Sequence, residues 1–294
     1  MGTIRSQNET ASTSLNSSIS WLVHCPIRQN PEVLLDPTDD CLIIFPLKDN
    51  NIWNTYKLQE SSFWTAEEVD ISGDANDWDN KLSESECALF SMILAFFASA
   101  DSIVCENLLQ HFSSEVQLPE ARFFYSFQAA MENIHSEVYS SLIQELIRDT
   151  VQCDRLLHGI EEFPCVAAKT SWALKWIQSS ASFPQHLIAF AAVEGLICRD
   201  EGIHTDFACL LYGKLKNRLS ITVLTTILTE ALKRLSIMPP NLLGLNIESM
   251  TEYIEYVTDR LLQSLGAPKA YNVTNPFPFM EMISLWSKTN FFER

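Results

Sequence analysis

Glycine is scarce in this chain, with only eight glycines among 294 residues. Parallel sheets that bind dinucleotides need glycine-rich loops, and β-rich folds use glycine in many of their turns. The sequence therefore argues against both classes of fold. Long helices, which need little glycine, are the expected alternative.

Basic residues are scarce as well. Only 20 lysines and arginines stand against 37 aspartates and glutamates, for a formal net charge of −17. A protein that binds a phosphate backbone directly needs a basic surface. We therefore expect no direct contact with nucleic acid, although a nucleotide enzyme can carry such a charge if another subunit holds the nucleotide.

Paired cysteines and long apolar runs are both missing. The eight cysteines are scattered and form no CxxC motif, so reduced, mostly buried thiols of a cytoplasmic protein are expected. The longest apolar stretch, Ala88 to Ala100, is shorter than the roughly 20 residues that cross a bilayer. We therefore predict a buried helix at this stretch and no contact with a membrane.

What the chain does contain is helical patterning. Residues 1–30 have little to bury and predict a mobile arm, and residues 31–294 predict a single domain that opens with an extended, proline-bearing lead-in over 31–60. Ser83 ahead of Glu86 resembles a capping box. Helices are expected at about 83–111, 119–147, 164–176, 184–211, 220–235 and 249–265. The expected fold class is an all-α bundle.

Two segments share the pattern Glu-x-x-His, namely Glu132 with His135 and Glu201 with His204. Residues three apart lie on one face of a helix, so each pair can point a carboxylate and an imidazole at one metal ion. One such pair occurs easily by chance. Two pairs on long apolar helices are stronger evidence, because polar groups that face a core need partners.

Two further carboxylates, Asp101 and Glu194, lie inside apolar runs. A lone buried acid is costly, whereas a pair of metal ions neutralises it. Four carboxylates and two histidines match the ligand set of ferritin-like di-iron carboxylate proteins. The alternative is that these acids lie at the surface or cap helices.

Tyr139 follows His135 by four positions and therefore shares its helical face. A tyrosine on a core helix usually contributes only to packing. Beside a metal pair that activates oxygen, it can instead be oxidised by one electron to a stable phenoxyl radical. Both interpretations remain open from the spacing alone.

Longer stretches resemble the eukaryotic, plant-like small subunit of class I ribonucleotide reductase. The similar stretches are Ser62 to Asp70 (SFWTAEEVD), Leu94 to Ala98 (LAFFA), Pro119 to Arg122 (PEAR), Glu132 to Glu137 (ENIHSE) and Arg199 to His204 (RDEGIH). The resemblance runs from about Leu34 to the C-terminus and implies a ferritin-like di-iron helical bundle.

The resemblance also implies residue roles. Asp101, Glu132 and His135 would hold one iron ion, and Glu194, Glu201 and His204 would hold the other. Tyr139 would carry the radical, and Trp64 and Asp200, with His135, would relay an electron and a proton.

The implied partner is the reductase large subunit, which binds ribonucleoside diphosphates and reduces them to deoxyribonucleotides for DNA synthesis. The small subunit then needs no nucleotide pocket, which agrees with the acidic charge. The resemblance implies a homodimer, or a heterodimer with another small subunit.

The chain departs from the family between Glu194 and Glu201. Seven positions separate them, which advances a regular helix by about 10.5 Å, whereas the two metals of one site lie about 3.5–4 Å apart. Family members have a further helical segment here that lines the pocket of the radical tyrosine. We therefore expect one helix to be missing or shortened, with lower stability and doubtful occupancy of the iron site.

A second departure concerns the C-terminus. Lys288 to Glu293 (KTNFFE) matches a family motif, after which family members continue with a tail that docks on the large subunit. Since the sequence ends at Arg294, weak contact with the large subunit is expected. Alternatives to an active subunit are a catalytically silent paralogue that pairs with an intact small subunit, a decayed-gene product, and, more remotely, an iron store.

Overall fold

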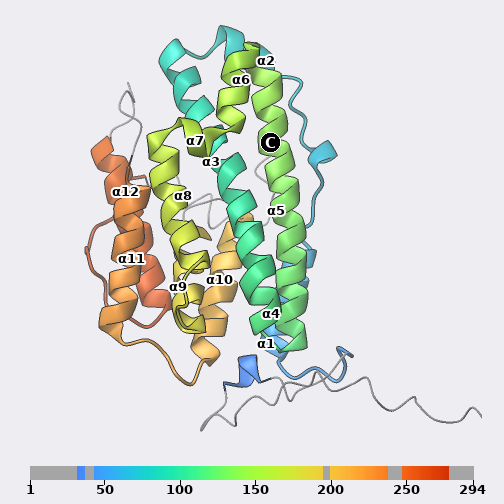
Figure 1. Ribbon diagram of the computed structural model, residues 1–294, viewed down its shortest axis with the longest axis vertical. Helices are drawn as coiled ribbons and strands as arrows, with labels where there is room; N and C mark the ends of the chain where they lie inside the picture. The colour runs from blue at the N-terminus through green and yellow to red at the C-terminus, as the bar shows by residue number, and fades with distance from the viewer. Residues whose placement is uncertain (1–31, 37–42, 195–198, 238–246, 278–294) are drawn as a thin grey trace, which may run out of the picture. The chain divides into compact units, whose positions relative to one another are not determined.

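The computed structural model describes residues 32–36, 43–194, 199–237 and 247–277 (Figure 1). Regular structure over these ranges is helical, with no strand among them, which confirms the predicted all-α class. The predicted arm of residues 1–30 lies outside the described residues. The division into this arm and one domain over 31–294 stays a prediction.

The described chain forms α-helices, joined by short 3₁₀ segments and one π-helical turn. In chain order they are η1 (Val33–Leu35), α1 (Asn50–Glu60), η2 (Ala66–Glu68), α2 (Asp74–Asn80), α3 (Glu84–Asn107), η3 (Leu108–Phe112, the π turn), α4 (Ser113–Glu115), α5 (Pro119–Leu146), α6 (Thr150–Leu157), α7 (Gly159–Glu162), α8 (Pro164–Ile177), α9 (Phe183–Glu194), α10 (Arg199–Lys214), α11 (Ile221–Leu235) and α12 (Ile247–Ser264).

Local sequence signals explain where the two longest helices begin. The Ser83 side chain accepts a hydrogen bond from the Glu86 amide, and the Glu86 carboxylate accepts one from the Ser83 amide at 2.8 Å. This is the predicted capping box. Helix α5 begins at Pro119. Proline has no N–H, and a residue in the first turn makes no intrahelical hydrogen bond through its N–H, so proline costs nothing there.

The predicted extended lead-in over residues 31–60 is wrong in its last third, which forms α1. The three prolines of the segment, Pro31, Pro37 and Pro46, all precede the helix and do not interrupt it. Asp49 caps it, because its carboxylate accepts hydrogen bonds from the amides of Asn51 and Ile52.

The predicted helix over 184–211 is two helices, since α9 ends at Glu194 and α10 begins at Arg199. Helices α9 and α10 pack against each other, as α3 packs along α5 (Figure 1). The largest core cluster includes Phe124 and Phe207, whose stacked rings have centroids 3.5 Å apart. This packing sets α10 against α5.

One stretch within the described residues, Glu84–Glu115, is long and apolar enough to cross a membrane by length and composition alone. Core helices of water-soluble proteins meet the same criteria. This stretch carries the buried carboxylate of Asp101 and packs against α5 and α8. The expectation of no membrane contact stays a prediction.

Candidate metal centre

Helices α3, α5 and α10 bring five of the six predicted metal ligands together. Each of the five residues is at most 7% exposed. They form two overlapping groups, in each of which the potential ligand atoms lie within 4.8 Å of one another. The groups are Asp101, Glu132 and His135, and Glu132, Glu201 and His204.

Two carboxylates and two imidazoles alternate around the middle of this centre. Nδ1 of His135 lies 3.3 Å from Glu132 Oε2 and 3.1 Å from Glu201 Oε1. Nδ1 of His204 lies 3.2 Å from Glu132 Oε1 and 2.7 Å from Glu201 Oε2. Each carboxylate therefore presents one oxygen to each histidine, which suits a carboxylate shared by two metal ions.

Asp101 shows that the centre holds more negative charge than its protein groups can balance. Burial, followed by the nearby charges of Glu132 and Glu201, raises the pKa of Asp101 to about 9. Its buried Oδ2 atom has no hydrogen-bond partner among the described residues. A cation beside that oxygen would offset the repulsion from the two glutamates and give Oδ2 a partner, so the residues present fit a metal site.

The two histidines lower the pKa of Glu201, in contrast to the raised pKa of Asp101. Burial alone would raise the pKa of this carboxyl group. The charge of His204 and the hydrogen bonds from His135 and His204 outweigh burial and hold the pKa of Glu201 well below its usual range. The carboxylate thus stays ionised and depends on positive charge beside it.

Two buried glutamines support the centre, and neither was predicted from the sequence. Gln59 of α1 is 3% exposed, and its amide lies 2.9 Å from His204 Nε2. In the amide orientation in which Gln59 Oε1 accepts a hydrogen bond from Nε2–H of His204, the lone pair of the ring lies on Nδ1, the atom that faces the centre. Gln128 donates to Glu132 Oε1 at 3.4 Å. Gln128 precedes Glu132 by one helical turn, a spacing that could have indicated it.

The structure also locates two of the residues predicted for radical chemistry. Trp64 is 7% exposed and stacks on the His135 ring, with centroids 5.5 Å apart and planes 23° apart. Tyr139 is half-buried, and its ring centroid lies 5.1 Å from that of Phe97. Trp64 therefore contacts a candidate metal ligand directly.

The side chains of Glu194 and Asp200 lie outside the described residues. Their backbones are the last residue of α9 and the second residue of α10. The expected separation of Glu194 from Glu201 assumed one regular helix, whereas α9 and α10 are separate helices. Glu201 and His204 reach the centre from α10. The role of Glu194 as sixth ligand stays a prediction.

Comparison with known proteins identifies a family. The sequence model of the ribonucleotide reductase small chain matches residues 42–197 and 195–276. This protein is 47% identical to a ribonucleoside-diphosphate reductase small chain of Arabidopsis thaliana, covering 90% of its own length and 89% of the relative's. It is 45% identical to one from Saccharomyces cerevisiae, covering 90% and 75%. A solved structure, the yeast Rnr4 homodimer, superposes with a TM-score of 0.76 at 33% identity, covering 87% and 93%.

The matches also support the expected internal gap. The two parts of the family match meet at residues 195–197, between α9 and α10. The Arabidopsis match extends over 295 positions, but 90% of 294 residues is only about 265, so roughly 30 positions have no residue in this chain. On the combined evidence of sequence, fold and buried ligand set, the chain belongs to the ribonucleotide reductase small chain family.

Proposed function

We propose that the centre binds two iron ions and that this small subunit of ribonucleoside-diphosphate reductase uses them to form a tyrosyl radical. The observation that carries the proposal is the buried square of Glu132, His135, Glu201 and His204, with the unsatisfied Asp101 beside it. Asp101, Glu132 and His135 would hold one ion, and Glu194, Glu201 and His204 the other.

The iron pair, when bound, would supply with dioxygen the oxidising power for a one-electron oxidation. Tyr139 would lose one electron and its hydroxyl proton, since it lies one helical turn beyond His135 on α5. Trp64, stacked on His135, would carry charge away from the centre, and Asp200 would assist it. Gln59 would fix the ring of His204 and so keep Nδ1 directed at the metal.

The family pairs a small subunit with a large one, and we propose the reductase large subunit as the partner of this chain. The solved yeast relative is described as a homodimer, which supports a homodimer here, with a heterodimer containing another small subunit as the alternative. We expect a cytoplasmic protein that binds no nucleic acid, in keeping with the net charge of −17.

A silent partner subunit is a second candidate function. Two observations favour it, namely the gap of roughly 30 positions after α9 and the half-buried state of Tyr139. A phenoxyl radical that water can reach is quenched easily, so incomplete cover of Tyr139 would shorten its life. In this case the chain would bind an intact small subunit and make no radical itself, and a decayed-gene product would not fold well enough to do even that.

Iron loading separates these functions. The purified chain is mixed with ferrous iron and oxygen, bound iron is counted, and the electron paramagnetic resonance spectrum is recorded. We expect two irons per chain and a tyrosyl signal that disappears in Tyr139→Phe but persists in Tyr253→Phe, a matched change at a half-buried tyrosine of α12. Folded protein with little iron and no radical would support the silent subunit, and insoluble protein the decayed product.

A further inference from the structure

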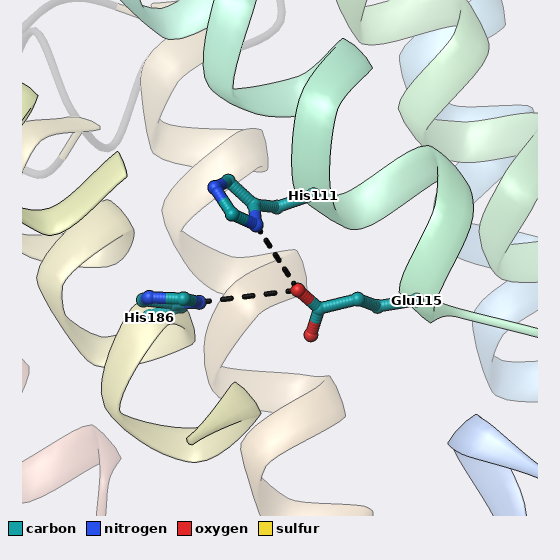
Figure 2. Close-up of side chains that lie close together, drawn as sticks. All are labelled: His111, Glu115 and His186. Atoms are coloured by element: carbon teal, nitrogen blue, oxygen red, sulfur yellow. Dashed lines mark hydrogen bonds and ion pairs between the residues drawn. The ribbon is translucent and has the colours of Figure 1, made fainter. Parts of the chain in front are cut away.

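A second group of metal-binding side chains lies where α9 meets the end of α3. His111 belongs to the π turn η3, Glu115 ends α4, and His186 lies in the first turn of α9. Figure 2 shows one ring nitrogen of each histidine directed at the same carboxylate oxygen. Nδ1 of His111 lies 3.1 Å from Glu115 Oε1, and Nδ1 of His186 lies 4.0 Å from it.

The proton on His111 can be assigned from its other nitrogen. Nε2 of His111 lies 2.6 Å from the backbone carbonyl oxygen of Ile177, which can only accept a hydrogen bond. Nε2 therefore carries a proton. In the neutral ring Nδ1 is then a bare lone pair, and it faces the Glu115 carboxylate.

The same reasoning applies to His186, which is only 5% exposed. The Ser179 hydroxyl donates to the carbonyl oxygen of Trp176 at 2.8 Å, so its oxygen is left to accept from His186 Nε2–H at 3.1 Å. Nδ1 of His186 is buried and has no hydrogen-bond partner among the described residues. It also points at Glu115.

With both rings neutral, three acceptor atoms converge with no proton between them, which is unfavourable unless a cation joins them. We propose that His111, Glu115 and His186 form an accessory site for a divalent ion of the zinc class, separate from the five-residue centre. Burial lowers the pKa of His186, which favours the neutral ring that metals bind.

The geometry suits a small tetrahedral ion. The three ligand atoms lie within 4.8 Å of one another. Zinc bonds of about 2.0–2.1 Å give ligand atoms roughly 3.3 Å apart, between the two separations from Glu115 Oε1. The His111 and Glu115 side chains are 21% and 33% exposed, so water can complete the coordination. Two imidazoles and one carboxylate favour zinc over magnesium or calcium.

The accessory ion would act as a clamp on α9. It would tie the first turn of α9 to the end of the α3 segment, and the carbonyl of Ile177 and the Ser179 hydroxyl would hold the two rings in place. Helix α9 ends at Glu194, immediately before residues 195–197, where the two parts of the family match meet. A clamp at its other end would stabilise a helix that has lost a neighbour.

Zinc counting tests the site. The full chain is stripped of metal, equilibrated with zinc, desalted and analysed by mass spectrometry. We expect one more zinc per chain in the wild type than in Glu115→Gln, which keeps the shape of the side chain but removes its charge. In Glu115→Gln, the affinity of this accessory site for zinc should fall at least about ten-fold. His158→Ala changes an exposed histidine beside Asp154 and serves as the matched control.

The outcome does not depend on iron at the centre, because only the difference between the wild type and its variants is used. Circular dichroism checks folding of the variants, and His111→Asn provides a second variant that should lose the same ion. Zinc should also raise the melting temperature of the wild type more than that of Glu115→Gln. Equal zinc counts and equal thermal shifts in wild type and variants would overturn the site and leave a histidinium–carboxylate ion pair in its place.

Discussion

Asp101 is the residue whose environment is least favourable without a metal ion. It is 3% exposed, and its carboxyl group faces Glu132 and Glu201. Its folded-state pKa of about 9 lies above the ordinary value of 3.8. The folded, metal-free chain therefore holds this proton more tightly than the unfolded chain does. The contribution of the protonated Asp101 carboxyl group to stability is fully present below about pH 3.8 and is lost as the pH rises toward 9.

Ionisation of Asp101 therefore destabilises the folded, metal-free chain at high pH. In this chain, Asp101→Asn should raise the free energy of unfolding at pH 8 by more than about 1 kcal/mol, because the amide needs no proton to be neutral. The gain should be smaller at pH 5, as urea unfolding can measure. With ferrous iron the order should reverse, because the amide is a poor ligand. A gain that does not change with pH would contradict the assigned shift.

Site residues that are close together in the sequence could be predicted, whereas site residues that are distant in the sequence could not. Glu132 and His135 share one helical turn, so a periodicity of 3.6 residues is enough to pair them. Gln59 lies 145 positions from His204 in the sequence. A single glutamine on α1 carries no periodic signal of such a contact. His111 and Glu115, four positions apart, offered a local signal, but their partner His186 comes from another helix.

At the scale of elements, α12 holds the segment that follows it through one carboxylate. Asp259 is fully buried, and its oxygens accept hydrogen bonds from the amides of Ala270, Tyr271 and Asn272 at 2.7, 3.0 and 2.7 Å. Asn272 has a positive φ of 59°, a left-handed conformation that asparagine adopts more readily than most residues. Three charge-assisted hydrogen bonds thus define the path of the chain after the helix.

We predict that Asp259→Ala lowers the free energy of unfolding by about 1–3 kcal/mol, since it leaves three partly buried amides without their charged acceptor. Asp259→Asn keeps one carbonyl oxygen and should lose roughly half as much. Urea unfolding monitored by circular dichroism measures both changes. Equal losses in the two variants, or losses below about 0.5 kcal/mol, would show that these hydrogen bonds are not the reason for the burial of Asp259.

The sequence indicated most helices because capping and proline signals are local. Helix α1 was missed because the prolines before it suggested an extended chain, and α6 and α7 are too short to show clear periodicity. The split between α9 and α10 could not be predicted either. Gly195 is a possible break, but the residues on both sides of it are apolar or helix-forming, so the sequence left open whether the helix continues through it.

For the whole molecule, the expected gap after α9 is the departure from the relatives that bears most directly on stability. Roughly 30 missing positions correspond to a helix with its connections, and such a helix would cover apolar surface on its neighbours. We predict a melting temperature about 10 °C below that of the Arabidopsis relative. Insertion of that relative's segment between residues 194 and 199 should recover most of the difference in calorimetry. No recovery would mean that the remaining helices already pack without it.

The position of the metal ligands on both sides of this gap has a consequence for how the chain folds. Glu132 and His135 come from α5, whereas Glu201 and His204 come from α10. A bound ion would therefore act as a reversible cross-link that closes a loop of some seventy residues and lowers the entropy of the open chain. The fraction of folded protein would then follow the supply of iron, so cells short of the metal would accumulate less of this subunit before any question of catalysis arises.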